Sequence, residues 1–410
     1  MKILNVLAQL PMRTGSGVYF SNLVDELTQL GHDNLLVYGI QDPYHVELSG
    51  IHYPIQFNTS KLPFPIAGMS DVMPYENTIY SQMSPEMIDN VLATFKEKLL
   101  HIKEQEKIDL VITHHLFFLS SMVREIFDDV PVVAFCHGTD LRQLERFPHF
   151  LERCQSIHKM DRIFVVSPKE IPKIHELFSY DKKDICLVGG GFDHKLFNRH
   201  HTKPIDNILR VCYAGKLSHS KGVYELASTF PKVKEEFDAV EYHLIGSTSP
   251  KEKKKLEELA GNLEGFKVYD AKDQQTMAHH LKQCDVFVLP SYYEALGLIA
   301  IEAMATGLFA VTSEIEGLQA ELGDVVNQSG AILYTALPTI YDLDKPVAAE
   351  IPAYVDRLAT NIIHQLHKVQ QGVPISEEVQ SIINRKSWYH LAKRIETELN
   401  DVVDAFALIE

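Results

Sequence analysis

Short apolar runs alternate along the whole chain with longer amphipathic stretches, and this alternation restricts the fold more than any other feature. It is typical of βαβ units, in which helices cover both faces of a buried parallel sheet. The first expected helix has apolar residues at Val18, Leu23, Leu27 and Leu30, which is a helical spacing. The expected strands are 2–7, 34–38, 110–114, 131–136, 162–166, 185–189, 209–215, 241–246, 266–270, 285–290 and 308–313.

The alternation stops in a glycine-rich and polar stretch at 189–207 and then starts again. A chain of 410 residues is longer than one hydrophobic core usually serves. We therefore expect an α/β protein with two Rossmann-like, doubly wound parallel-sheet domains over 1–200 and 201–385. Residues 386–410 are expected to form a C-terminal helix. The aperiodic stretch 41–85, rich in Pro and Tyr, is expected to be a long surface excursion.

The composition excludes several classes of function. A formal net charge of -16 argues against nucleic-acid binding, which depends on cationic contacts to phosphates. The five cysteines are dispersed without a C-x-x-C pair, which indicates reduced core thiols rather than disulfides or a zinc site. No stretch approaches the roughly 20 apolar residues of a membrane helix, and residues 1–10 lack the features of a signal peptide. We expect a soluble, cytoplasmic protein.

The sequence SYYEALGLIAIEAMATG, residues 291–307, contains two glutamates with seven residues between them. Glu294 follows an expected strand and Glu302 lies about two turns further along in the next helix, so both can face one cleft. The first amides of this helix, near Gly297 and Leu298, favour an anion such as a diphosphate. Carboxylates beside them suit sugar and ribose hydroxyls, because each accepts two hydrogen bonds. The structural alternative is one solvent-facing and one capping glutamate.

A second candidate segment is GKLSHSKG, residues 215–222, which also follows an expected strand. Lys216 and Lys221 are spaced to reach one region from a short loop. Two ammonium groups there would stabilise the negative charge that grows on a departing diphosphate. The alternative is a pair of solvated surface lysines.

A third segment, RTGSGVY at 13–19, connects the first expected strand to the first helix. Gly15 and Gly17 let backbone approach a ligand closely, and a helix N-terminus favours an anion. As a dinucleotide fingerprint the segment fails, because Phe20 stands at the third glycine position and no acidic residue ends the second strand. This argues against an NAD-dependent oxidoreductase and leaves a phosphate-binding loop or a structural turn.

The segment CHGTD, residues 136–140, follows the strand expected at 131–136. His137 therefore stands at the edge where open α/β sheets bind ligands, although a lone histidine is more often structural. Asp140 is expected to orient His137 or to contact an acceptor.

These motifs together resemble the family 4 glycosyltransferases, which adopt the GT-B fold. The resemblance rests on E-x7-E, on GKLSHSKG, on VSPKE at 166–170 and on the hinge-like GGGFDHKLFN at 189–198. It implies that Glu294 contacts the donor sugar and that Glu302 contacts the nucleotide ribose. Lys216 is a mild departure, since the family commonly has Arg there, and a glycine pair replaces the usual Asn-Gly of the hinge.

The resemblance also implies roles for residues outside the E-x7-E segment. Backbone at Val268 and Tyr269 would meet the nucleobase, and His137 would lie near the donor sugar. Trp388 would begin a helix that crosses back to the N-terminal domain. The implied contacts of the donor diphosphate are Gly15, Gly17, Lys216, Lys221, Gly297 and Leu298.

The function implied is a retaining, metal-independent transfer of a hexose-type sugar from a nucleotide diphosphate, UDP by family frequency, without a cofactor. His137, Glu294 and Lys221 are the implied catalytic residues. The N-terminal domain would bind the acceptor, which the motifs leave open between a small molecule, a glycan and a protein. HGTD is similar to the segment of bacillithiol-pathway malate glycosyltransferases, but four residues do not specify malate. The oligomeric state is equally unspecified.

Other readings of the sequence are a nucleotide-sugar epimerase on the same fold and a catalytically silent binding subunit. The first leaves GKLSHSKG and E-x7-E together unexplained, and the intact Lys221, Glu294 and Glu302 argue against the second. The D-x-D at 342–344 matches a GT-A metal motif but lies among prolines, so we expect a surface loop. The pairs His114–His115 and His279–His280 are adjacent, so their side chains should diverge, and we expect no metal.

Overall fold

The structure is a computed structural model of the chain. It describes residues 1–10, 14–71, 73–200, 203, 206–294, 296–342 and 344–408. The chain forms two compact units. The first unit comprises Met1–Gly190 and Trp388–Glu410, and the second comprises Gly191–Ser387. The chain therefore leaves the first unit and returns to it, so this unit is assembled from two segments that are far apart in sequence.

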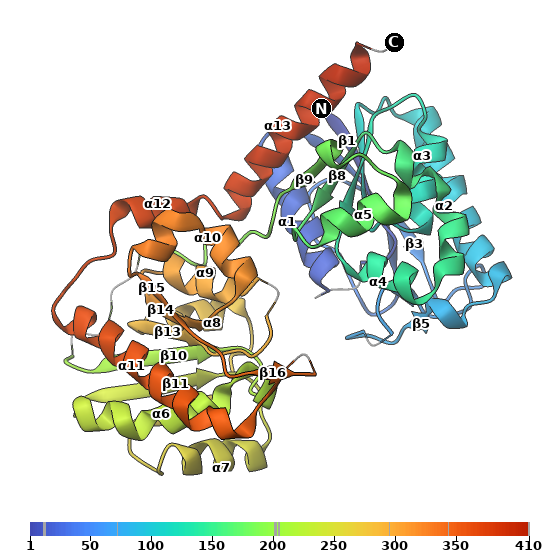
Figure 1. Ribbon diagram of the computed structural model, residues 1–410. Helices are drawn as coiled ribbons and strands as arrows, with labels where there is room; N and C mark the ends of the chain where they lie inside the picture. The colour runs from blue at the N-terminus through green and yellow to red at the C-terminus, as the bar shows by residue number, and fades with distance from the viewer. Residues whose placement is uncertain are drawn as a thin grey trace. The chain divides into compact units, whose positions relative to one another are not determined.

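The first unit is built on a sheet in which neighbouring strands are parallel (Figure 1). Its strands, in spatial order, are β3 (Ile51–Gln56), β2 (Asp33–Ile40), β1 (Lys2–Leu7), β6 (Leu110–His114), β7 (Val132–Cys136), β8 (Arg162–Val165) and β9 (Ile185–Leu187). Ile3 pairs with Asn34 on one side and with Leu110 on the other. The central strands are apolar throughout because helices cover both faces of the sheet.

Two groups of helices cover the two faces of this sheet. Helices α1 (Gly15–Gln29) and α13 (Trp388–Ala407) pack on one face, where Leu27 and Leu399 meet Ile3 in a single apolar cluster. The helices of the opposite face are α2 (Pro85–Gln105), α3 (Phe118–Ile126), α4 (Thr139–Arg146) and α5 (Glu170–Phe178). Trp388, the first residue of α13, is 7% exposed and belongs to the apolar cluster that contains Ile3.

Two sequence expectations about this unit were wrong in detail. The stretch 41–85 is not only a surface excursion, because it supplies β3 at the sheet edge and the short pair β4 (Ala67–Gly68) and β5 (Thr78–Ile79). Val18 is 41% exposed, and the buried face of α1 begins instead with Tyr19 and Phe20.

The second unit repeats the architecture with a second parallel sheet. Its strands, in spatial order, are β12 (Phe266–Tyr269), β11 (Val240–Ile245), β10 (Leu209–Ala214), β13 (Val286–Leu289), β14 (Phe309–Ser313) and β15 (Ile332–Thr335). The strand order reverses after β12, so the chain crosses the sheet to reach β13. Beyond this sheet, β16 (Ile340–Tyr341) and β17 (Lys345–Pro346) form a short antiparallel ribbon.

Helices again cover both faces of the second sheet, as Figure 1 shows. One face carries α6 (Val223–Glu236), α7 (Pro250–Leu259) and α11 (Ile351–Gln370). The other carries α8 (Gln274–Leu281), α9 (Leu298–Ala305), α10 (Glu316–Gln328) and α12 (Glu377–Asn384). The predicted α/β class, with two doubly wound parallel sheets, is confirmed. Among the described residues, no helix is long and apolar enough to cross a membrane.

Candidate functional site

An ion pair near the carboxyl end of the second sheet joins Lys221 to Glu294. Lys221 Nζ lies 2.6 Å from Glu294 Oε2, and the two side chains are 29% and 24% exposed. Lys221 ends a helical turn just before α6, and Glu294 follows β13. The structure therefore brings together two residues that lie 73 positions apart in the sequence. A diphosphate-binding ammonium and a sugar-binding carboxylate would stand side by side here.

Close backbone packing holds the Lys221 loop against the end of β13. Gly222 has φ +65, and a Cβ added there would lie 2.1 Å from the carbonyl oxygen of Pro290. Tyr292 N also donates to Ser220 O at 3.0 Å. Only glycine fits this approach, because any side chain would push the loop away from β13. The glycine that ends GKLSHSKG thus fixes the position of Lys221.

Glu302 lies in α9 with 7% of its surface exposed. Burial and the nearby Asp193 raise the pKa of Glu302 to about 8. The helix begins at Leu298, and Gly297 precedes it with φ +72. Its first amides lie a few residues after Glu294, and no side chain that the structure describes caps this helix at Gly297, so the amides suit an anion. Ala295 lies outside the described residues.

Lys216 is exposed, and its ammonium forms no ion pair with any residue that the structure describes. Its carbonyl oxygen accepts a hydrogen bond of 2.9 Å from the Tyr213 hydroxyl, which fixes the backbone just after β10. The structure brings Lys221, but not Lys216, into contact with the E-x7-E segment.

In the first unit, the glycine segment forms the start of α1. Thr14 caps this helix, since its hydroxyl accepts a 3.0 Å hydrogen bond from Gly17 N. The Gly17 amide is therefore used within the protein. Gly15 is exposed, with open space where a Cβ would stand. Of the two glycines expected at the diphosphate, Gly15 is the one that the structure leaves accessible; Arg13 lies outside the described residues.

His137 belongs to a cluster of imidazoles at the carboxyl ends of β6 and β7. His137 Nε2 lies 3.0 Å from His114 Nδ1, and the two rings are stacked with centroids 5.2 Å apart. The His115 ring lies 4.9 Å from the His137 ring, and His115 Nε2 is 3.2 Å from Gln9 Nε2. The expectation that His114 and His115 diverge was wrong, because both rings contact the ring of His137; His115 itself has a φ of +69.

Two buried carboxyl groups, those of Glu170 and of Asp140 within the segment itself, support the HGTD segment at residues 137–140. Gly138 has φ +77, and a Cβ there would lie 2.9 Å from Glu170 Oε1. Burial raises the pKa of Glu170 to about 7. Asp140 is fully buried and accepts hydrogen bonds from Leu116 N and the Cys136 thiol. Of its two expected roles, contact with an acceptor does not fit, since this carboxylate is bonded inside the protein and exposes no oxygen. Its role in orienting His137 stays a prediction.

Two family models match consecutive parts of the chain. A model described as Glycosyltransferase Family 4 matches residues 13–196, and one described as Glycosyl transferases group 1 matches residues 197–334. The chain belongs to the family 4 glycosyltransferases. The family resemblance seen in the sequence motifs is thereby confirmed over both parts of the chain.

Relatives of this glycosyltransferase agree with that assignment. N-acetyl-alpha-D-glucosaminyl L-malate synthase of Bacillus anthracis is 23% identical over 321 residues, covering 75% of this chain and 78% of the relative. Glycogen synthase of Mycobacterium tuberculosis is 27% identical over 203 residues, covering 47% of this chain. The chain thus spans about half the length, 48%, of that curated relative. The structure of Anabaena HepE in complex with UDP and glucose has a TM-score of 0.60 at 15% identity, and the match covers 98% of this chain and 100% of that chain.

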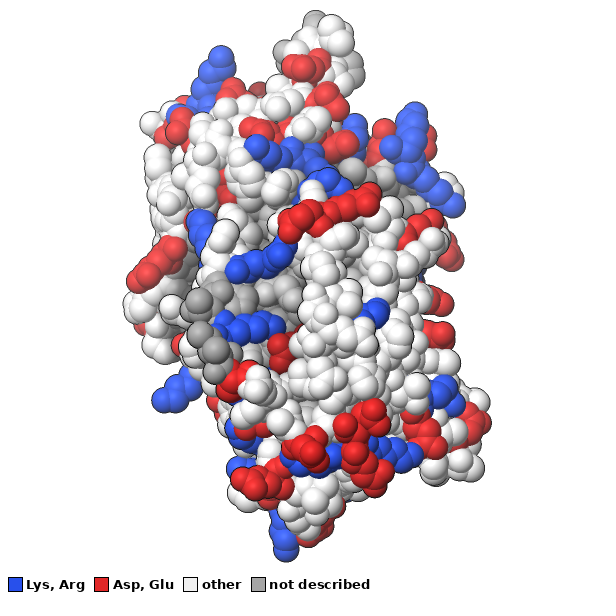
Figure 2. All heavy atoms as spheres, turned by 90° about the vertical axis from the view of Figure 1, so that its left-hand side faces the viewer, with Lys and Arg blue, Asp and Glu red and all other residues white. Residues whose placement is uncertain are grey.

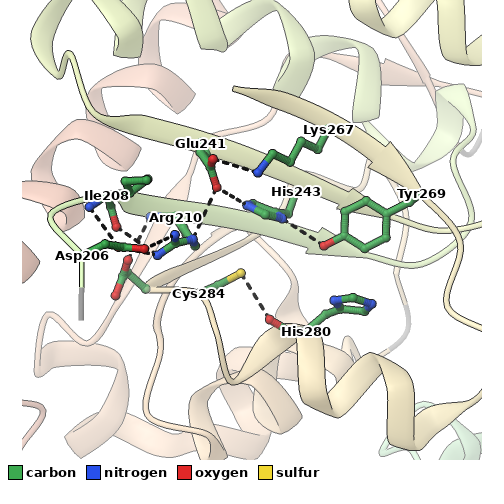
Figure 3. Close-up of polar contacts among 10 residues, drawn as sticks. Asp206, Ile208, Arg210, Glu241, His243, Lys267, Tyr269, His280 and Cys284 are labelled. Atoms are coloured by element: carbon green, nitrogen blue, oxygen red, sulfur yellow. Dashed lines mark hydrogen bonds and ion pairs between the residues drawn. The ribbon is translucent and has the colours of Figure 1, made fainter. Parts of the chain in front are cut away.

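The nucleobase end expected in this glycosyltransferase lies at the end of β12. Figure 3 shows the Tyr269 ring lying over the sheet, with its hydroxyl 2.9 Å from His243 Nδ1. The Tyr269 carbonyl accepts a hydrogen bond of 2.9 Å from Gly246 N, and Val268 pairs with Leu244 in the sheet. The Tyr269 carbonyl is thus used within the sheet, whereas β12 is the outer strand and, among the described residues, its other edge carries no strand. The expected contact of Val268 and Tyr269 with a nucleobase stays a prediction.

Charge on the glycosyltransferase surface is mixed. On the face drawn in Figure 2, acidic and basic side chains alternate, and the described residues there form no continuous basic patch. Asp342 is exposed in the β16–β17 turn and pairs with Lys345, as expected of a surface loop; Leu343 lies outside the described residues. In the ranges that the structure describes, His, Cys, Asp and Glu form no group of three that could hold a metal ion.

Proposed function

We propose that this protein is a retaining glycosyltransferase that transfers a hexose-type sugar from a nucleoside diphosphate, with UDP as the first candidate, without a metal ion. The single observation that carries the proposal is the Lys221–Glu294 contact of 2.6 Å beside the start of α9. It combines a cation for phosphate, a carboxylate for sugar hydroxyls and helix amides for an anion in one place. The complex of Anabaena HepE with UDP and glucose supports the choice of UDP.

In the proposed reaction, the bond between the anomeric carbon and the diphosphate oxygen breaks, and its electron pair leaves with the nucleotide. Lys221 and the amides at the start of α9 stabilise the growing negative charge. The acceptor hydroxyl oxygen then bonds to the anomeric carbon on the same face, and its proton passes to the departing phosphate oxygen. Glu294 holds the sugar hydroxyls, Glu302 holds the ribose, and His137 donates a hydrogen bond to the sugar.

Ligand-dependent thermal stability tests the donor site. The protein is heated with UDP, GDP, ADP or NAD, first with EDTA and then with Mn²⁺. A nucleotide that binds only the folded protein at about 100 times its Kd adds about 2.7 kcal/mol of stability, which gives a clear melting shift. We expect a shift with UDP that does not need Mn²⁺ and that weakens in Glu302→Ala.

Two other outcomes have defined meanings. A shift with NAD alone would contradict a transferase, and a UDP shift that appears only with Mn²⁺ would contradict metal independence. If UDP binds but UDP-glucose is neither hydrolysed nor consumed with any sugar, polyol or hydroxy-acid acceptor, the protein is a silent binding subunit rather than an enzyme.

A further inference from the structure

The hydrogen bond between His114 and His137 decides which nitrogen of His137 carries a proton. His114 Nδ1 and His137 Nε2 are 3.0 Å apart. Between two neutral imidazoles, one nitrogen donates and the other accepts. Two arrangements are therefore available, and they leave His137 Nδ1 either protonated or bare.

The surroundings of His114 favour one of the two arrangements. His114 is 2% exposed, and its ring stacks on Phe135 with centroids 5.0 Å apart. Its second nitrogen, Nε2, is buried without a hydrogen-bond partner among the described residues. A buried N–H without an acceptor is costlier than a buried lone pair without a donor. The proton of His114 therefore belongs on Nδ1, which donates to His137 Nε2.

All three imidazoles of the cluster are uncharged. Burial lowers the pKa of His115 to about 3, and burial together with the neighbouring His115 lowers the pKa of His137 to about 3. The pKa of His114 lies well below its usual value for the same reason, reinforced by the other two rings. The nearest carboxylate, Asp140, opposes the shift at His137 and is itself bonded to Leu116 N and Cys136. No imidazolium forms near neutral pH, so the tautomers alone matter.

His137 is half-buried, and its Nδ1 has no partner among the residues that the structure describes. We propose that His114 is a positioning residue that holds His137 in the tautomer protonated at Nδ1, so that His137 meets its ligand as a hydrogen-bond donor. In this form His137 cannot accept a proton from an acceptor hydroxyl at Nδ1. It can donate to an oxygen of the transferred sugar. This inference rests on the proposed function only for the identity of that ligand.

The tautomer is measurable without a ligand. In protein labelled with ¹⁵N-histidine, the His137 ring nitrogens are assigned by the signals lost in His137→Asn. We expect Nδ1 in the chemical-shift range of a protonated nitrogen and Nε2 in that of a bare one, unchanged between pH 6 and pH 8. A protonated Nε2, or a charged ring in this range, would overturn the proposal directly.

Two variants of His114 test its role in transfer. His114→Phe keeps the ring stack but removes the N–H that bonds His137 Nε2, so the preference of His137 for the tautomer protonated at Nδ1 should weaken. The rate of UDP release from UDP-glucose should fall at least about tenfold, with KM for UDP-glucose within about twofold. His114→Asn places an amide N–H where Nδ1 stood and should restore most of the rate. Equal rates in His114→Phe and the wild type would contradict the proposal.

A control and a separate readout distinguish the possible failures. His52→Phe removes another histidine bond of the first unit, to the Tyr38 hydroxyl at 2.8 Å, and should leave the rate unchanged. If His114→Phe does not fold, the wild-type tautomer still decides the proposal. If His137→Ala transfers sugar at the wild-type rate, the role of His137 in the proposed function fails, while the tautomer measurement stands on its own.

Discussion

Lys221 and Glu294 neutralise each other in the protein without a ligand. Their side chains are about a quarter exposed, so the pair contributes modest stability and its main effect is on charge in the site. An arriving diphosphate competes with Glu294 for Lys221, whereas an arriving sugar needs Glu294 itself. The two residues should therefore respond differently to substitution.

Glu294→Gln should separate nucleotide binding from transfer. The amide no longer holds Lys221 as an ion pair, so free UDP should bind at least as tightly as in the wild type. UDP release from UDP-glucose should nevertheless fall by about 100-fold or more, because a neutral amide holds the sugar hydroxyls less well. Calorimetric titration with UDP and a steady-state assay measure the two effects. Lys221→Met is the matched variant and should lose UDP affinity, and the opposite pattern would contradict the assigned roles.

Glu302 should make nucleotide binding depend on pH. Its pKa of about 8 means that the carboxyl is largely protonated at neutral pH, whereas ribose hydroxyls bond best to the ionised form. Between pH 7 and pH 9, the Kd for UDP should therefore fall by about tenfold. Titrations in buffers of different ionisation enthalpy should show proton release below pH 8. Glu302→Gln should abolish both effects, and an unchanged pH dependence in that variant would assign it to another group.

The same group affects folding in the opposite direction. The folded protein holds the Glu302 proton more tightly than the unfolded chain does, since the pKa rises from about 4.5 to about 8. Stability without a ligand should thus decrease as the pH rises through this window.

For single residues, the sequence predicted where along a strand or helix a residue stands better than it predicted which groups its side chain contacts. Strand ends were recognisable as apolar runs, which placed His137 and Glu294 at ligand-binding edges. The sequence did not predict that Asp140 is buried, because this depends on how the loops around it fold. Nor did it predict that the Gly17 amide donates to the Thr14 hydroxyl, because this depends on the rotamer of Thr14. His114 and His115 could have been linked to His137, since all three follow neighbouring parallel strands, but the turn at His115 requires an unusual backbone angle.

At the scale of elements, the backbone of the Lys221 loop packs directly against the backbone that follows β13. Its closest approach is at Gly222, where a methyl group would meet the Pro290 carbonyl at 2.1 Å. The distance between Lys221 and Glu294 therefore depends on this glycine.

Gly222→Ala should lower both stability and nucleotide affinity. The left-handed backbone alone costs about 1 kcal/mol for alanine, and the clash with Pro290 adds to this. We expect UDP affinity to fall at least tenfold (about 1.4 kcal/mol) because Lys221 is displaced. Gly372→Ala is the matched control, since Gly372 has φ +66 but open space around a Cβ. Melting curves should show the larger loss of stability in Gly222→Ala, since Gly372→Ala carries the backbone cost alone, and UDP titrations should show a loss of affinity in Gly222→Ala but not in Gly372→Ala.

Periodicity predicted the inner strands of both sheets, but of the four outer strands it predicted β9 and β12 and missed β3 and β15. The runs 2–7 and 110–114 coincide with β1 and β6 because covered parallel strands are apolar on both faces. β3 was missed because it is half-exposed and contains Pro54, which an edge strand tolerates.

At the scale of the molecule, each unit has its own sheet and its own apolar clusters. Helix α13 belongs to the first unit although it follows the whole second unit in the sequence. Damage to α13 should therefore affect the core of the first unit and leave nucleotide binding by the second unit intact.

Leu399→Ala tests this separation. Leu399 is fully buried in α13, so the substitution should cost about 2–5 kcal/mol. Calorimetry should show an earlier melting transition, while the stabilisation by UDP stays within error of the wild type. Leu408→Ala is the matched control, because Leu408 is 88% exposed. Loss of UDP stabilisation in Leu399→Ala alone would show that the units do not behave separately.

Because the chain leaves the first unit and returns to it, the two units complete their cores in a fixed order during translation. When residue 387 has been joined, every strand of both sheets exists, but α1 alone covers its face of the first sheet, and the surface that receives Trp388, Leu391 and Leu399 is exposed. The second unit can complete its core during synthesis, whereas the first unit exposes apolar surface until residues 388–407 have been synthesised and have folded onto it. A premature stop codon just before Trp388 would leave this apolar surface exposed in the finished chain. Quality-control factors could then bind it, although the chain still contains Lys221 and Glu294.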